Sequence, residues 1–307
     1  MPVLQPGAPA HLIAPASPPR DVGAYPDILT AVRRDWSIRT AYMPGTSRGY
    51  LSAPDAERAD ALQHALTDPD AKAVMCVRGG YGCLRLLPHL DWGALQQATP
   101  RWIVGYSDIT ALQLACWHRL GWASISGPVA TEWPKLSQEM RSAVFRSTRP
   151  DSWTPAPPPE ADPPTPLTTG TATGPLVGGT LSVLTRLLGT PYMPDLSGAI
   201  LLLEDVQEPP YAIDRMLMHL ELAGVLDTLA GVVLGQFSVP ESVSEPTLSI
   251  ETVLADYFAD RSYPVLINVP YGHCLPRLCL PMGVPMRIHL TEKNVAMTCY
   301  PDAESQY

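Results

Sequence analysis

Apolar segments that alternate with amphipathic segments over the first 120 residues constrain the fold more than any other feature of this chain. The apolar segments predict strands, at 11–16, 37–42, 73–77 and 102–104. Helical spacing predicts helices between them, at 26–34, 52–66 with Ser52 as cap, 84–90 and 109–120. Strands and helices in alternation pair through right-handed crossovers, which predicts an open, doubly wound α/β sheet. Ligands bind such sheets at the carboxyl ends of the strands.

The second half of the chain follows a proline-rich segment, 150–172, that excludes helix and central strand. We interpret it as a stiff linker between an N-terminal domain, 1–149, and a C-terminal domain, 173–307. A long surface loop inside one domain is the alternative. The later pattern predicts helices at 181–188 and 213–223 and strands at 199–203, 231–234, 265–269, 286–290 and 295–299. The C-terminal domain is therefore expected to be a β-rich α/β domain.

Composition limits the classes of protein to which the chain can belong. Of its 307 residues, 46% are hydrophobic and 17% charged, which is typical of a folded globular protein. A net charge of −9 argues against nucleic acid or an anionic membrane as the main partner. No apolar run could span a bilayer and no signal peptide is recognisable, so we expect a cytoplasmic protein. Six scattered cysteines without ligand spacing predict reduced, mostly buried thiols; we expect no metal site and no cofactor.

One serine, Ser107, stands where the strand at 102–104 gives way to the helix at 109–120. At such a turn, free amides and the positive end of the helix dipole can stabilise an oxyanion, as in the nucleophile elbow of hydrolases. The local sequence Gly-Tyr-Ser-Asp-Ile lacks the second glycine of that motif, and a serine at this position is equally able to be an ordinary N-cap. Ser107 is therefore a candidate nucleophile, with the N-cap as the alternative.

A nucleophilic serine needs a base, and the base needs an orienting acceptor. Among the seven histidines, His273 follows a strand into a loop broken by proline and glycine, where catalytic imidazoles are usually held. The alternative is a loop histidine bonded to a backbone carbonyl. Glu204 and Asp205 end an apolar strand and point to opposite faces, so at most one can meet a histidine. An ionised carboxylate there needs a partner, which is His273 or, alternatively, Arg215.

Four sequence blocks make the pattern specific. They are Val-Arg-Gly-Gly-Tyr-Gly-Cys at 77–83, Gly-Tyr-Ser-Asp-Ile-Thr at 105–110, Leu-Glu-Asp-Val-Gln-Glu-Pro-Pro-Tyr-Ala-Ile-Asp-Arg at 203–215, and Pro-Tyr-Gly-His at 270–273. In this order, and over essentially the whole chain, they resemble the LD-carboxypeptidase family of serine peptidases. That family includes muramoyltetrapeptide carboxypeptidases and microcin C immunity peptidases. The chain departs from it at 178–181, where Gly-Gly-Thr-Leu replaces the common Gly-Gly-Asn-Leu.

The resemblance implies a catalytic triad in which Ser107 is the nucleophile, Glu204 the orienting carboxylate and His273 the general base. It also implies an oxyanion hole made by the backbone amides of Gly80 and Asp108. The fold it implies is a flavodoxin-like N-terminal domain with a smaller, β-rich C-terminal domain. The triad would be assembled across the domain interface, often within a homodimer.

The activity that the resemblance implies is hydrolysis of the L,D peptide bond before the terminal D-alanine of murein tetrapeptides, during cell-wall recycling. A first alternative keeps the triad but hydrolyses peptidyl- or aminoacyl-nucleotide amides; Trp133 is then a candidate for stacking on the base, or else a packing residue. A second alternative is a non-catalytic ligand-binding protein. An exopeptidase must hold the terminal carboxylate of its substrate. Arg78 and Arg277 are candidates for that contact, and each could equally form structural ion pairs.

Overall fold

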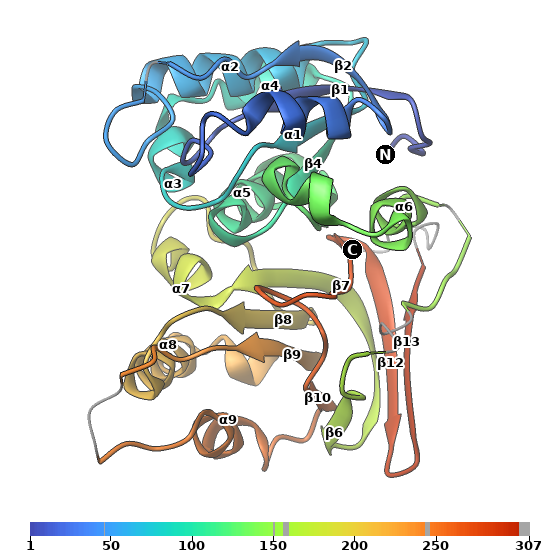
Figure 1. Cartoon of the computed structure of the whole chain (residues 1–307). Coiled ribbons are helices and arrows are strands. Elements are labelled where there is room, and N and C mark those ends of the chain that lie inside the picture. Colours follow the sequence, from blue (N-terminus) through green and yellow to red (C-terminus); the bar gives the residue numbers. More distant parts are fainter. Residues whose placement is uncertain (46, 150, 156–159, 243–245, 301–307) are drawn as a thin grey trace. The chain divides into compact units, whose positions relative to one another are not determined.

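The computed structural model of the chain describes residues 1–45, 47–149, 151–155, 160–242 and 246–300. It divides into two units of comparable length, Met1–Arg149 with Cys279–Pro281 and Pro150–Leu278 with Met282–Tyr307. Each unit has its own sheet, with helices packed against it (Figure 1). The mixed α/β class predicted from the sequence is thereby confirmed.

The N-terminal unit is built on a six-stranded sheet with the strand order β11-β5-β4-β3-β1-β2. Its elements are β1 (Ala8–Ile13), α1 (Tyr25–Val32), β2 (Trp36–Ala41), α2 (Asp55–Thr67), β3 (Ala73–Cys76), α3 (Cys83–Leu86), α4 (Trp92–Gln97), β4 (Trp102–Gly105), α5 (Thr110–Leu120), β5 (Ser124–Ser126), α6 (Gln138–Arg146) and the late strand β11 (Leu280–Met282). The first five strands pair in parallel. Their order, 2-1-3-4-5, is that of the flavodoxin-like fold, as predicted.

The central strands of this sheet are buried on both faces. Every residue of β3 and of β4 is buried, which explains why these strands are continuous apolar runs rather than alternating ones. The predicted helix cap at Ser52 is wrong, because helix α2 begins only at Asp55 and has Pro54 as its N-cap. The Ser52 hydroxyl instead donates to the backbone oxygen of Ala14, 2.5 Å away, and so fixes the chain next to the end of β1.

The C-terminal unit is built on a seven-stranded sheet with the strand order β13-β12-β7-β8-β9-β10-β6. Its elements are β6 (Thr165–Thr168), β7 (Gly170–Thr180), α7 (Leu181–Leu184), β8 (Ile200–Asp205), α8 (Pro210–Leu222), β9 (Gly231–Phe237), α9 (Ile250–Phe258), β10 (Val265–Ile267), β12 (Pro285–Thr291) and β13 (Asn294–Cys299). Strands β7 to β10 are parallel, whereas β6 and the long hairpin β12–β13 pair antiparallel (Figure 1).

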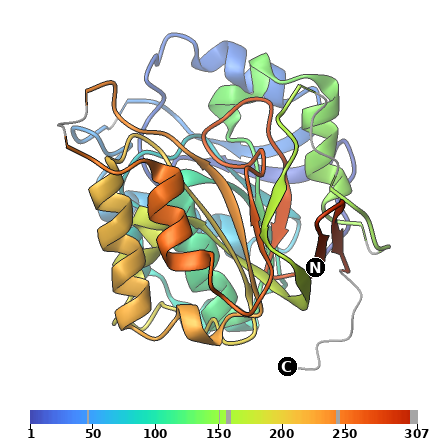
Figure 2. The same ribbon diagram turned by 90° about the horizontal axis from the view of Figure 1, so that it is seen from below.

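Helices α8 and α9 lie side by side against this sheet (Figure 2). The hydroxyl of Tyr257 on α9 donates to the carboxylate of Asp214 on α8 at 2.5 Å. Burial, together with this acceptor, raises the pKa of Tyr257. Helix α9 is absent from the sequence-based prediction, because its short apolar stripe follows a long irregular segment.

The predicted linker at 150–172 is in part a sheet element. Residues 150 and 156–159 lie outside the described residues, whereas Trp153 exchanges two backbone hydrogen bonds with Cys299, of 3.2 and 2.9 Å. Further on, Thr165–Thr168 form β6 at the edge of the sheet. An edge strand tolerates Pro166, since one of its sides needs no ladder hydrogen bonds.

Candidate active site

Ser107 lies on the predicted turn, two residues after the end of β4, and opens a 3-10 helix, Ser107–Ile109, that leads into α5. Its φ of +64° is in the left-handed region, which costs a residue with a side chain about 1–3 kcal/mol. The N-cap of this helical segment is Tyr106, and no side chain makes a capping hydrogen bond there. The N-cap alternative for Ser107 is therefore wrong. The geometry has the strained backbone of a nucleophile elbow.

A glycine turn between β3 and α3 packs against this serine. A Cβ atom on Gly79 would lie 2.9 Å from the Cβ of Ser107 and 3.1 Å from its Oγ, so only glycine fits there. The next residue, Gly80, has a φ of +103°, and a Cβ on it would collide with the side chain of Ser17. Both glycines are thus required by close approach to serine side chains.

Hydrogen bonds hold the glycine turn in place. The Ser17 amide donates to the Gly79 oxygen at 3.2 Å, and the Ser17 hydroxyl accepts from the Tyr81 amide at 3.3 Å. The Asp108 carboxylate accepts from the Cys83 amide at 2.8 Å, at the start of α3. Burial raises the pKa of Asp108. Asp108 consequently ties the serine turn to the glycine turn, so the backbones of Gly80 and Asp108 are fixed relative to one another.

Glu204 and His273 meet in the C-terminal unit. Glu204 lies near the end of β8 and exposes 1% of its side chain, and His273 exposes 20%. The Glu204 Oε2 atom lies 2.8 Å from Nδ1 of His273 and accepts from the His273 amide at 3.2 Å. The other carboxylate oxygen, Oε1, accepts from the Thr180 hydroxyl at 2.5 Å. The sequence predicted the first pairing but not the contact with Thr180.

The loop that carries His273 is shaped to fit the carboxylate. Gly272 has a φ of +111°, and a Cβ on it would lie 2.5 Å from Glu204 Oε2. A guanidinium nitrogen of Arg277 donates to the Gly272 oxygen at 3.2 Å. With a carboxylate at Nδ1, the imidazole is assigned a proton on that nitrogen, which leaves Nε2 able to accept one. The partner of His273 Nδ1 is thus the Glu204 carboxylate and not a backbone carbonyl.

The alternative partner for Glu204 is also excluded. The guanidinium of Arg215 lies over the ring of Tyr211, 5.8 Å from its centroid. Asp205, on the opposite face of β8, accepts from the amide and the hydroxyl of Ser182 at 2.7 and 3.2 Å. Burial raises the pKa of Asp205 to about 6. The two neighbouring carboxyl groups thus have separate partners.

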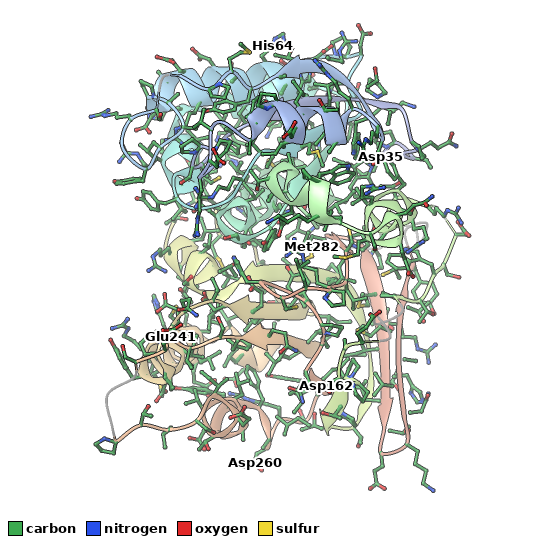
Figure 3. All side chains as sticks on the ribbon, viewed as in Figure 1. Asp35, His64, Asp162, Glu241, Asp260 and Met282 are labelled. Atoms are coloured by element: carbon green, nitrogen blue, oxygen red, sulfur yellow. The ribbon has the colours of Figure 1, made fainter. Side chains whose placement is uncertain are left out.

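Three further candidates from the sequence have structural partners. Arg78 donates to the backbone oxygen of Pro18 at 2.9 Å, and Arg277 is buried beside Gly272. Trp133 is fully buried and donates from its indole nitrogen to the carboxylate of Asp35 at 2.9 Å (Asp35 is labelled in Figure 3). Trp133 is therefore a packing residue and not a platform for a nucleobase.

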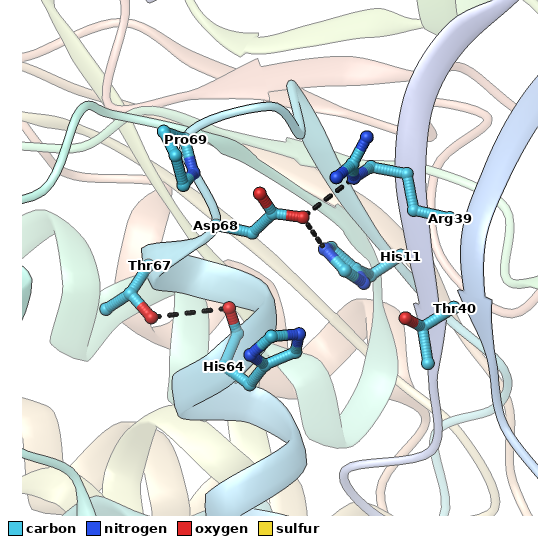
Figure 4. Close-up of a pocket in the computed structure, with 7 residues that line it drawn as sticks. All are labelled: His11, Arg39, Thr40, His64, Thr67, Asp68 and Pro69. Atoms are coloured by element: carbon cyan, nitrogen blue, oxygen red, sulfur yellow. Dashed lines mark hydrogen bonds and ion pairs between the residues drawn. The ribbon is translucent and has the colours of Figure 1, made fainter.

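A pocket of about 540 Å³ in the N-terminal unit contains none of the predicted site residues (Figure 4). Its polar side chains bind one another: the Asp68 carboxylate lies 2.9 Å from Nε2 of His11 and accepts from Arg39 at 2.7 Å. Burial lowers the pKa of His11. The hydrogen bond from the Asp70 amide, together with those from Arg39 and His11, holds the pKa of Asp68 well below its usual range. The cluster fastens the loop after α2 to strands β1 and β2.

All six cysteines are free thiols, five of them buried and Cys274 partly exposed, which confirms the sequence-based prediction. In the part of the chain that the structure describes, no group of three or more His, Cys, Asp or Glu side chains is arranged to hold a metal ion. Nor does any helix among the described residues have the length and apolar character needed to cross a membrane.

Comparison with known proteins identifies the family. The family model described as LD-carboxypeptidase N-terminal domain matches residues 10–127, and that described as LD-carboxypeptidase C-terminal domain matches 173–288. The chain is 34% identical to the murein tetrapeptide carboxypeptidase of Pseudomonas aeruginosa, over 89% of this chain and 90% of that protein. It is 28% identical to the microcin C7 self-immunity protein MccF of Escherichia coli, over 87% and 85% of the two chains.

A solved structure agrees with these sequence relatives. The crystal structure of muramoyltetrapeptide carboxypeptidase from Oxalobacter formigenes matches with a TM-score of 0.81 and 29% identity, covering 95% of this chain and 98% of that one. Both halves of the chain are thus matched in sequence and in fold. The chain belongs to the LD-carboxypeptidase family.

Proposed function

We propose that this protein is a serine carboxypeptidase that hydrolyses the L,D peptide bond before the terminal D-alanine of murein tetrapeptides, in the recycling of cell-wall fragments. The observation that carries the proposal is the buried Glu204 carboxylate at 2.8 Å from Nδ1 of His273. A buried carboxylate behind an imidazole is the arrangement that orients a general base. The murein tetrapeptide carboxypeptidase among the relatives supports the choice of substrate.

In the proposed mechanism, Nε2 of His273 takes the hydroxyl proton of Ser107 while Oγ attacks the carbonyl carbon before D-alanine. The tetrahedral intermediate then collapses to an acyl-enzyme, and His273 gives its proton to the leaving amine of D-alanine. Water, deprotonated by the same imidazole, hydrolyses the ester and restores Ser107. The Glu204 carboxylate stabilises the imidazolium that forms in each step.

The backbone amides of Gly80 and Asp108 are proposed as the oxyanion hole. In the described part of the chain, the Gly80 amide makes no hydrogen bond to another residue, so it can donate to a ligand. Asp108 is the second residue of the 3-10 helix Ser107–Ile109, and the amides in the first turn of a helix lack intrahelical acceptors. Removing one donor of this kind typically lowers kcat by about 10²–10³.

The deciding experiment incubates L-Ala-D-Glu-mesoDAP-D-Ala with the wild type and with Ser107→Ala and follows D-alanine by mass spectrometry. We expect release by the wild type and a loss of about 10⁴–10⁶ in kcat for the variant, because the nucleophile is gone. An unchanged thermal unfolding midpoint would show that Ser107→Ala is folded. Cleavage by a folded Ser107→Ala protein would refute the triad.

Hydrolysis of peptidyl- or aminoacyl-nucleotide amides by the same residues is the second candidate function. The observation that favours it is the 28% identity to MccF over most of both chains. The burial of Trp133 removes the aromatic residue suggested for stacking on a base. If the wild type leaves the tetrapeptide intact but cleaves an aspartyl sulfamoyl adenosine, this candidate replaces the first. Failure to react with a serine-directed phosphonate would instead support a non-catalytic ligand-binding protein.

We further propose that the protein acts in the cytoplasm, which fits the recycling of wall fragments, and that it forms a homodimer, as its family resemblance implies. Light scattering coupled to size-exclusion chromatography tests the second part directly. A mass of about 66 kDa, twice the 33.2 kDa of the chain, is expected, and a mass near that of one chain would refute the dimer.

A further inference from the structure

Thr180 is the last residue of β7 and stands next to Glu204 in the parallel β7–β8 ladder. Its hydroxyl donates to Glu204 Oε1 at 2.5 Å, and both side chains are buried. A hydrogen bond to a buried carboxylate is among the stronger ones in proteins, because charge assists it and water does not compete. The proposed catalytic mechanism assigns no role to this hydrogen bond.

Thr180 also occupies the N-cap of a helix, where a threonine side chain ordinarily accepts a hydrogen bond from an amide in the first turn. It is the N-cap of α7, yet its side chain makes no capping hydrogen bond. The carboxylate of Asp205 accepts from the Ser182 amide in the first turn of α7 instead. The two neighbouring carboxylates of β8 thus have different partners: Asp205 accepts from the first turn of α7, and Glu204 accepts from the Thr180 hydroxyl.

The surroundings of Glu204 leave its carboxylate little freedom. Two glycines approach it closely. A Cβ atom on Gly272 would lie 2.5 Å from Glu204 Oε2, and a Cβ atom on Gly235 in β9 would lie 3.2 Å from the Cβ of Glu204. Within this enclosure, Oε1 is held by Thr180, and Oε2 faces the His273 ring and amide. Both carboxylate oxygens of Glu204 thus have hydrogen-bond partners, and the Thr180 hydroxyl is a donor to Oε1.

We propose that Thr180 is a positioning residue, which fixes Glu204 so that Oε2 orients the His273 imidazole for proton transfer. The inference rests on the proposed function, since it assigns Thr180 a role in the same reaction. It acts through Glu204 and not through the substrate. Loss of the hydroxyl should therefore lower kcat and leave KM unchanged.

The test compares Thr180→Val, which keeps the shape but loses the hydroxyl, with Thr180→Ser, which keeps the hydroxyl. We expect Thr180→Val to lower kcat about ten- to a hundredfold, the range for one charge-assisted hydrogen bond, with Thr180→Ser within about threefold of the wild type. Thr180→Ala gives the same readout should valine disturb folding. Thr185→Val is the matched control, because Thr185 is also buried and its hydroxyl donates to backbone oxygens in its own helical turn.

A double-mutant cycle separates positioning from a merely structural role. In a Glu204→Gln background, Thr180→Val should change kcat by less than about threefold, because the group through which it acts has gone. A further ten- to hundredfold loss there, or an equal loss in Thr180→Ser, would overturn the proposal.

The rate of labelling of Ser107 by a fluorophosphonate provides a readout that needs no natural substrate. If the wild type is labelled but does not cleave the tetrapeptide, the proposed substrate fails while the role of Thr180 is still tested by the labelling rates. We expect those rates to fall in Thr180→Val and to be restored in Thr180→Ser. Equal labelling of Thr180→Val and the wild type would refute the positioning role.

Discussion

The turn that carries Ser107 and the strand end that carries Glu204 position their side chains in different ways. At Ser107 the work is done by the backbone: a φ of +64°, the close approach of Gly79, and amide hydrogen bonds to Ser17 and Asp108. At Glu204 side chains contribute more: the carboxylate accepts from a hydroxyl and lies beside an imidazole, in addition to accepting from the His273 amide.

The difference predicts which changes each region tolerates. A site shaped by close backbone approach should be damaged by an added atom, because neighbouring backbone cannot move aside cheaply. A site held by buried hydrogen bonds should be damaged when one polar atom is exchanged, even where volume and shape stay the same.

Glu204→Gln exchanges one oxygen for an amide nitrogen at constant volume and should lower kcat by about 10³–10⁴, with little change in KM. A glutamine cannot accept from both Thr180 and His273, and it cannot stabilise an imidazolium. Steady-state kinetics with the tetrapeptide give the value. Glu251→Gln, at an exposed position on α9, is the control and should keep full activity. A Glu204→Gln enzyme within tenfold of the wild type would show that side-chain charge is not what this region supplies.

The pH dependence of stability should reveal the buried carboxyl next to Glu204. Burial raises the pKa of Asp205 to about 6, so the folded protein holds this proton more tightly than the unfolded chain does. Stability from this group is then complete below about pH 4 and is lost as the pH rises to about 6, by about 3 kcal/mol. Urea unfolding of the wild type and Asp205→Asn at pH 4 and pH 7 measures it. A difference between the two proteins that is the same at both pH values would contradict the assignment.

Gly79→Ala adds one methyl group to the region built by backbone. Its Cβ would lie 2.9 Å from the Cβ of Ser107, so we expect the serine to shift and kcat to fall about ten- to a hundredfold. Gly93→Ala is the control, because Gly93 lies in helix α4 and a Cβ there meets only the Asp91 side chain, at 3.3 Å. That variant should be fully active and slightly more stable. Equal kinetics for the two alanine variants would mean that the glycine turn does not position Ser107.

Much of the fold could be predicted from the sequence, because it depends on periodicity. The alternation of apolar and amphipathic segments located most of the strands in both units to within a few residues, including all of β8 except its two acidic end residues. Elements with weak or interrupted periodicity were missed, such as α9 and the edge strand β6. Strand β6 lies in a proline-rich segment, and only its partner β10 reveals that it is a strand.

The candidate site was only partly predictable for a related reason. Residue type and position at a strand end are local properties, and they indicated Ser107, Glu204 and His273. The contact between Thr180 and Glu204 depends on strand register between β7 and β8, which no local pattern encodes. The N-cap alternative for Ser107 was likewise decided by a backbone angle and not by residue type.

The smallest expected effect is a change in the free energy of unfolding that has opposite signs in the two regions. Ser107→Gly removes the nucleophile but also relieves a left-handed backbone conformation, so the inactive protein should be more stable by about 1 kcal/mol. His273→Ala is equally inactive, but it takes the ring donor away from a buried carboxylate and should be less stable by about 1–3 kcal/mol. Urea unfolding of both proteins at pH 7 measures the signs. Two inactive variants that shift in opposite directions would establish that strain is stored at the serine and hydrogen-bond energy at the histidine. A loss of stability in both would mean that the Ser107 hydroxyl stabilises the fold by more than its backbone conformation costs.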